Sequence, residues 1–263
     1  MGICIVNVYT KNDIMRKSII IILLLALVVT SCKKKKQIKP DLGGSTPVPF
    51  TTTEYVEMGT YDDSGRPNYL VASDLVGGSF SAYVHDMLPE SVNLTKTHSD
   101  FLKNADLEIT AKSDVYITFV SEVTSHSNTV GYYTYKTGSS PKKPEDIIKI
   151  IYIFPNASSN KGGTMKAGDK VKLGSFEPGT SLGFVLLDNA WDKATKKINK
   201  NAPHYCSNKE LNPENVADLK YHTVLFDYAA ESKVVIGFED INRSLPECDN
   251  DFNDVVMYAT VVK

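Results

Sequence analysis

Residues 237–254 read GFEDINRSLPECDNDFND and join two of the most strand-like runs of the chain, Val234–Phe238 and Val255–Val262. The stretch is rich in carboxylates and contains a single cation, Arg243. Many oxygen donors without soft ones suit a hard cation, calcium above all. We therefore expect an acidic loop that binds structural calcium and holds the last two strands in register. The expected ligands are Glu239, Asp240, Asp249, Asp251, Asn253 and Asp254.

Asp249, Asp251 and Asn253 have the spacing of the first ligands in a helix-loop-helix calcium loop. Asp254 stands where that motif needs glycine, Thr260 stands where it needs a bidentate glutamate, and the flanking residues are β-branched. The stretch is therefore not an EF-hand. An acidic, turn-rich surface loop is the alternative, because Asp and Asn also bend the backbone by bonding to nearby amides. Mutual repulsion among so many carboxylates favours metal binding.

Residues 1–31 have the features of a lipoprotein signal. The basic pair Arg16–Lys17 precedes the apolar run Ile19–Val29, which is too short to span a bilayer comfortably. The run ends in Val29-Thr30-Ser31-Cys32, which resembles the site read by lipoprotein signal peptidase. We therefore expect Cys32 to be acylated, with a single membrane anchor as the alternative.

Residues 32–50 have the composition of a flexible tether, because prolines, glycines and the run Lys33–Lys36 leave almost nothing apolar to bury. The lysines either contact anionic lipid headgroups or form a solvated charge run. We expect an exported outer-membrane lipoprotein, on the periplasmic or the surface side. Met15 stands where the basic region of the signal begins, so Met1 and Met15 are both candidate starts.

Residues 51–263 suit one β domain. From Phe50 onward the chain has 21 basic against 29 acidic side chains, a net charge of −8, so no nucleic-acid partner is expected. Short β-branched and aromatic runs between turn residues indicate a β-sandwich, with a turn or two of helix at Pro213–Leu219. The expected strands are Glu54–Met58, Phe80–Val84, Leu107–Thr110, Val115–Val120, Val130–Tyr135, Ile147–Phe154, Val171–Ser175, Leu182–Leu187, Thr223–Phe226, Val234–Phe238 and Val255–Val262.

Several blocks of this body carry a family resemblance, most specifically Gly237–Asp240 together with Asp249–Val256. The other blocks are Leu88–Glu90, Val115–Glu122, Asn128–Tyr135, Ile153–Ser158, Gly162–Gly163, Gly168–Asp169, Leu173–Phe176, Gly183–Phe184, Asn189–Trp191, Leu211–Glu214 and His222–Leu225. Together they resemble the domain of unknown function found in LruC-type bacterial lipoproteins, an exported and often calcium-associated family. The resemblance implies an all-β, antiparallel sandwich of jelly-roll type and no established activity. Cys206 departs from it, because the family pattern has serine there.

Cys206 and Cys248 are the two cysteines left in the exported body once Cys4 is removed with the signal and Cys32 is acylated. Export favours oxidation, so we expect a disulfide between them. Two thiols too far apart to join are the alternative.

No catalytic motif is present, so we expect a non-catalytic binding or scaffold module. A glycosidase that pairs Glu122 or Glu239 with an Asp is the less favoured possibility. Binding of a glycan is the alternative function, through Tyr133, Tyr135 and Trp191, although such residues more often cover sheet faces. The expected partners are the membrane, through the lipid anchor, and a glycan or another envelope protein.

Acylation of Cys32 predicts that cells fed a clickable fatty acid label the wild-type protein and not the Cys32→Ala variant, because only the cysteine thiol accepts the lipid. The measurement is in-gel fluorescence of the immunoprecipitated protein. Equal labelling of the two proteins contradicts the prediction.

Overall fold

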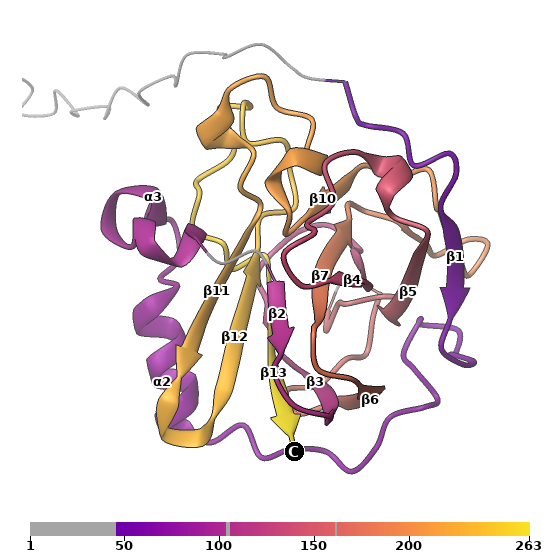
Figure 1. The fold of residues 1–263 in the computed structure, drawn as a ribbon, viewed down its shortest axis with the longest axis vertical. Coiled ribbons are helices and arrows are strands. Elements are labelled where there is room, and N and C mark those ends of the chain that lie inside the picture. The colour runs from indigo at the N-terminus through magenta and orange to yellow at the C-terminus, as the bar shows by residue number, and fades with distance from the viewer. Residues whose placement is uncertain (1–45, 104–105, 161) are drawn as a thin grey trace, which may run out of the picture. The chain divides into compact units, whose positions relative to one another are not determined.

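The fold is described from a computed structural model, over residues 46–103, 106–160 and 162–263. Most elements in these ranges are strands, and they form two packed sheets with few helices (Figure 1). The expected β-rich, sandwich-like architecture is confirmed at this level. The expected signal, Cys32 and most of the tether lie outside the described residues. In the described ranges, no helix has both the length and the apolar character that crossing a membrane requires.

The first sheet has the strand order β1-β5-β4-β7-β10, and β2 shares one edge of β7 with β10. Its strands are β1 (Glu54–Glu57), β2 (Asp106–Ile109), β4 (Thr129–Lys136), β5 (Lys149–Phe154), β7 (Thr180–Leu187) and β10 (His204–Cys206). β1 pairs with β5 in parallel, so the expectation of a wholly antiparallel sandwich is wrong there. Parallel neighbours need a long connection, and the whole of residues 58–148 separates these two strands.

The second sheet has the antiparallel strand order β11-β12-β13-β3-β6. Its strands are β3 (Ser113–Glu122), β6 (Lys170–Phe176), β11 (Thr223–Tyr228), β12 (Lys233–Phe238) and β13 (Val255–Val262). A separate two-stranded hairpin is formed by β8 (Trp191–Asp192) and β9 (Lys197–Ile198). The acidic stretch is the connection between β12 and β13, which are adjacent strands. The expectation of an acidic loop between two strands is therefore confirmed.

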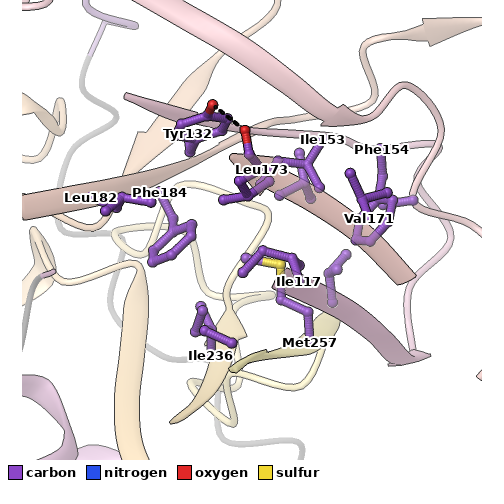
Figure 2. Close-up of a cluster of buried hydrophobic side chains, with 14 of the residues drawn as sticks. Ile117, Tyr132, Ile153, Phe154, Val171, Leu173, Leu182, Phe184, Ile236 and Met257 are labelled. Atoms are coloured by element: carbon purple, nitrogen blue, oxygen red, sulfur yellow. Dashed lines mark hydrogen bonds between the residues drawn. The ribbon is translucent and has the colours of Figure 1, made fainter. Parts of the chain in front are cut away.

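The main core lies between the two sheets, as the alternation of side chains along each strand requires. Ile117 and Met257 of the second sheet belong to the same buried cluster as Phe184 of the first sheet (Figure 2). Tyr132 reaches across this cluster, and its hydroxyl donates a hydrogen bond to the carbonyl oxygen of Leu173 at 3.4 Å. The inner faces of both sheets are thus sealed against each other.

The outer face of the second sheet is covered by α2 (Gly78–Met87) and α3 (Leu94–Thr97) (Figure 1). We expected a strand at Phe80–Val84, and this is wrong because these residues lie in α2. Phe80 and Val84 are one helical turn apart and both are buried, so their spacing fits the helical period. The short helix expected at Pro213–Leu219 is reduced to a 3-10 turn. The 3-10 turns are Ser99–Lys103, Pro144–Asp146, Lys209–Leu211, Ala217–Leu219 and Ala229–Glu231.

The outer face of the first sheet is also covered, and His204 is buried there. Its Nδ1 lies 2.8 Å from the carbonyl oxygen of Ala202, so Nδ1 carries the proton and donates it. Nε2 therefore accepts a hydrogen bond from the hydroxyl of Tyr55, also at 2.8 Å. Phe50 stacks on the imidazole with a centroid separation of 4.5 Å. Burial lowers the pKa of His204 to about 4.

The lowered pKa of His204 predicts that stability falls as the pH drops from about 6.5 to about 4. In that window the imidazole of His204 is protonated in the unfolded chain but stays neutral in the folded protein. The free energy of unfolding therefore decreases by roughly 3 kcal/mol. Urea unfolding at several pH values measures the decrease. The His204→Gln variant should lose this part of the pH dependence, whereas His85→Gln, at an exposed position, should keep it. Identical pH dependence in the wild type and His204→Gln would refute the assignment.

Candidate metal centre

The acidic loop is held in shape by Arg243, which is buried. Its Nε and Nη2 donate to Oδ1 of Asn250 at 2.9 and 2.7 Å. Its Nη1 donates to the carbonyl oxygens of Tyr221 and Asp218 at 2.6 and 3.0 Å. The single cation of the loop is therefore occupied by neutral acceptors, and its hydrogen bonds fix the loop backbone.

Phe252 anchors the loop in the hydrophobic layer beneath α2. Its ring is fully buried, and its backbone has the left-handed φ of 57°, which is rare for a bulky residue. The N–H of Phe252 donates to Oε1 of Glu239 at 2.9 Å. A Cβ at Gly237 would lie 2.3 Å from the carbonyl oxygen of Phe252, so only glycine fits at that position of β12. These contacts fix the residues on either side of Phe252.

Three carboxylates meet beside this anchor, and we call Glu90, Asp249 and Asp251 the acidic triad. Each offers one ligand oxygen, and these atoms lie within 4.8 Å of one another. Calcium–oxygen bonds are about 2.3–2.6 Å long, so oxygens spaced in this way can share one ion. Oδ2 of Asp251 also accepts the N–H of Ser91 at 2.7 Å, and its Oδ1 accepts the N–H of Asn253 at 3.1 Å. The triad thus bridges the α2–α3 connection and the β12–β13 loop.

The electrostatics of the loop disfavour its charged form in the absence of a cation. Burial, together with the charges of Asp249 and Glu239, raises the pKa of Asp251 to about 7. Burial and the charges of Asp240 and Glu239 raise the pKa of Asp254 to about 10. Burial likewise raises the pKa of Glu239. A bound cation would favour the ionised form of each of these groups.

The six expected ligands do not surround one point. Asp249 and Asp251 lie in the acidic triad. Asn253 lies at its edge, where its Nδ2 donates to Oε2 of Glu90 at 3.2 Å. Glu239 braces the loop instead: besides the bond from Phe252, its Oε2 accepts the thiol of Cys248 at 2.9 Å. Nearby Asp254 accepts the N–H of Asp240 at 2.8 Å.

Asp240 belongs to a second cluster, with His126 and Asp188, whose ligand atoms also lie within 4.8 Å of one another. Nδ1 of His126 is 2.6 Å from Oδ1 of Asp188 and 3.6 Å from Oδ2 of Asp240. Thr124 and Asn128 donate to the same oxygen of Asp240 at 2.5 and 2.7 Å. The hydrogen bond to Asp188 raises the pKa of His126. The imidazolium can therefore balance these two carboxylates without a metal.

Glu90 is the member of the triad that the sequence did not single out as a ligand. It lies between α2 and α3, far along the chain from the acidic loop. The one sequence feature that pointed to this segment was the block Leu88–Glu90 of the family resemblance. That block does not indicate which residues lie beside Glu90 in the fold.

The expected disulfide is wrong, because Cys206 and Cys248 are both buried and are not bonded to each other. Adjacent residues of a strand point to opposite faces. On β10 the side chain of Tyr205 faces the inter-sheet core, so Cys206 faces the outer layer of the first sheet. Cys248 instead lies against Glu239.

The aromatic residues expected to contact glycans do not form a surface platform. Tyr133 and Trp191 have exposed fractions of 1% and 3%. Tyr135 is half-buried, and its hydroxyl donates to Asp106 at 2.5 Å. The alternative interpretation of these tyrosines, as cover for a sheet face, describes them better.

Comparisons with known proteins bear on the C-terminal part of the chain. No curated protein and no solved structure matches the sequence. No named relative therefore connects it with LruC-type lipoproteins. One family model matches residues 176–261, which is less than half of the chain but includes the acidic loop and excludes Glu90. Residues 176–261 of this chain are therefore similar to the domain of unknown function DUF4114.

Proposed function

We propose that this protein is a non-catalytic, calcium-stabilised β-sandwich that serves as an exported binding or scaffold module, with a calcium ion held at the acidic triad. The observation that carries the proposal is the meeting of Glu90 with Asp249 and Asp251, whose ligand atoms lie within 4.8 Å. An oxygen-only set of donors is the type that calcium prefers.

The ion would tie together two segments that already touch. The N–H of Leu94 donates to the carbonyl oxygen of Asn250 at 2.9 Å, and the N–H of Ser91 donates to Asp251. Calcium adds ionic bonds across the same contact. It would therefore hold the β12–β13 loop against the α2–α3 connection, and with it the register of the last two strands.

The environment of the carboxylates favours structure over catalysis. Asp251 and Glu239 accept backbone N–H groups, which positions them as braces. Glu122, one of the carboxylates considered for hydrolysis, accepts both the N–H and the hydroxyl of Ser159, at 3.1 and 2.5 Å. A carboxylate held in this way stabilises the turn at Ser159.

The proposed place of the protein in the cell rests on its N-terminal sequence. We propose that Cys32 carries a lipid anchor and that the tether of residues 32–50 separates the folded body from the outer membrane, on its periplasmic or surface side. The partner would be a glycan or another envelope protein. The LruC-type relationship and the jelly-roll topology are part of the same proposal, supported by the sequence blocks that carry the resemblance.

Calcium binding at the triad predicts that the full-length protein melts at a higher temperature in calcium than in excess chelator. At free calcium one hundred times the dissociation constant, the stabilisation is about 2.7 kcal/mol. For a domain of this size that corresponds to a rise of roughly 5–10 °C. Differential scanning calorimetry measures the rise, and isothermal titration calorimetry measures the affinity.

The Asp249→Ala/Asp251→Ala double variant should lose both the binding and the rise in melting temperature, and Glu90→Gln should weaken the affinity about tenfold or more. The Glu108→Ala/Glu145→Ala double variant removes the same charge at exposed positions and should behave like the wild type. If chelator leaves the melting temperature unchanged and calorimetry detects no binding at millimolar calcium, the loop is an acidic turn and the proposal is wrong.

A further inference from the structure

A groove of about 600 Å³ lies beside β1, the edge strand of the first sheet, and residues of the β8–β9 hairpin form part of its lining. We call it the tyrosine groove. Its aromatic and charged lining side chains are those of Tyr55, Glu57, Tyr61, Tyr152, Lys197 and Lys200. They come from segments far apart in the sequence and share no residue with the acidic triad.

The tyrosine rings of the groove are fixed before any ligand binds. Tyr55 stacks on Tyr152 with a centroid separation of 5.9 Å and an interplanar angle of 26°. Its hydroxyl is held by His204. The ring of Tyr61 meets Trp191 edge to face at 5.4 Å, and its hydroxyl donates to Glu57 at 3.3 Å. Rigid, partly exposed tyrosines offer apolar faces at a low entropic cost.

The hairpin beside these rings is basic, although the body as a whole is acidic. Residues 191–200 contain four lysines and one aspartate. Lys196 pairs with Asp63. Lys197 and Lys200 are exposed, and neither forms an ion pair within the described ranges. A local positive potential above aromatic rings favours a ligand that is both flat-faced and anionic.

The chemistry of the groove narrows the class of ligand. Glu57 is an acceptor for hydroxyl donors, the lysines are donors to a carboxylate, and the tyrosines suit the C–H face of a sugar ring. A polynucleotide has one negative charge for each residue and would be repelled by the acidic body. A sugar chain with spaced carboxylates meets all the groups of the groove with less repulsion.

We propose that the tyrosine groove binds an oligosaccharide that contains uronic acid. Tyr55 and Tyr61 stack on its rings, Lys197 and Lys200 bind its carboxylates, and Glu57 accepts a sugar hydroxyl. This site is different from the aromatic set Tyr133, Tyr135 and Trp191. It goes beyond the proposed calcium function and does not depend on it.

The test is isothermal titration calorimetry of the full-length protein with tetrasaccharides of hyaluronan and of unsulfated chondroitin, which carry a carboxylate on every second ring, and with neutral chitotetraose. At least one acidic sugar should bind more tightly than chitotetraose. Tyr61→Leu should weaken that binding roughly tenfold, since it removes the stacking face. Lys197→Ala/Lys200→Ala should also weaken it about tenfold, and more so at low salt.

Matched variants separate a lost contact from a lost fold. Tyr61→Phe keeps the ring and should bind more tightly than Tyr61→Leu. Lys142→Ala/Lys143→Ala removes two exposed lysines elsewhere and should bind like the wild type with an unchanged melting temperature. Asp249→Ala/Asp251→Ala should also retain the sugar, which separates this site from the calcium proposal. No binding of either acidic sugar at millimolar concentration, binding insensitive to the groove variants, or tighter binding of single-stranded oligothymidylate would overturn the proposal.

Discussion

The burial of the Phe252 ring is the constraint on which the acidic loop depends. A bulky residue at φ 57° is strained, by about 1–3 kcal/mol, and burial of the ring with the bond from its N–H to Glu239 offsets that strain. Gly237 has no side chain, which leaves room for the carbonyl group of Phe252. With this residue fixed, Asp251 and Asn253 on either side are turned toward Ser91 and Glu90. Packing in the core thus sets the geometry of the polar surface above it.

The negative charge of the two carboxylate clusters in this region is balanced in different ways. His126 lies between Asp188 and Asp240, so an imidazolium supplies the positive charge locally. The acidic triad has no such partner, because Arg243 is occupied by Asn250 and by backbone carbonyls, and no ion pair within the described ranges includes a triad carboxylate. Charge repulsion in a partly buried site must then be relieved by protonation or by a cation from solution. This difference favours calcium at the triad rather than at the histidine cluster.

The sequence predicted those parts of the fold that local periodicity governs. The β-branched and aromatic runs in β3, β7 and β13 identified strands, and the composition of residues 239–254 identified the acidic loop. The same argument failed at Phe80 and Val84, since a short apolar run fits a strand as well as one face of a helix. It also failed where a contact between residues far apart in the chain determines the site, because nothing near Glu90 in the sequence indicates that Asp249 lies beside it. The burial of Trp191 and the orientation of Cys206 away from Cys248 likewise depend on which face of the first sheet is covered.

Both outer sheet faces are covered, which leaves the edge of the first sheet as the candidate binding surface. α2 and α3 cover the second sheet, and the segments that contain Phe50, Ala202 and Leu211 pack on the first, so neither face offers a broad binding surface. β1 is an edge strand, and the tyrosine groove lies along it. Tyr55 joins that groove to the interior through His204, whose Nε2 accepts the hydroxyl only while the imidazole is neutral. The orientation of the Tyr55 side chain in the groove therefore depends on the burial that keeps His204 uncharged. It does not depend on the loop between β12 and β13, which belongs to the other sheet.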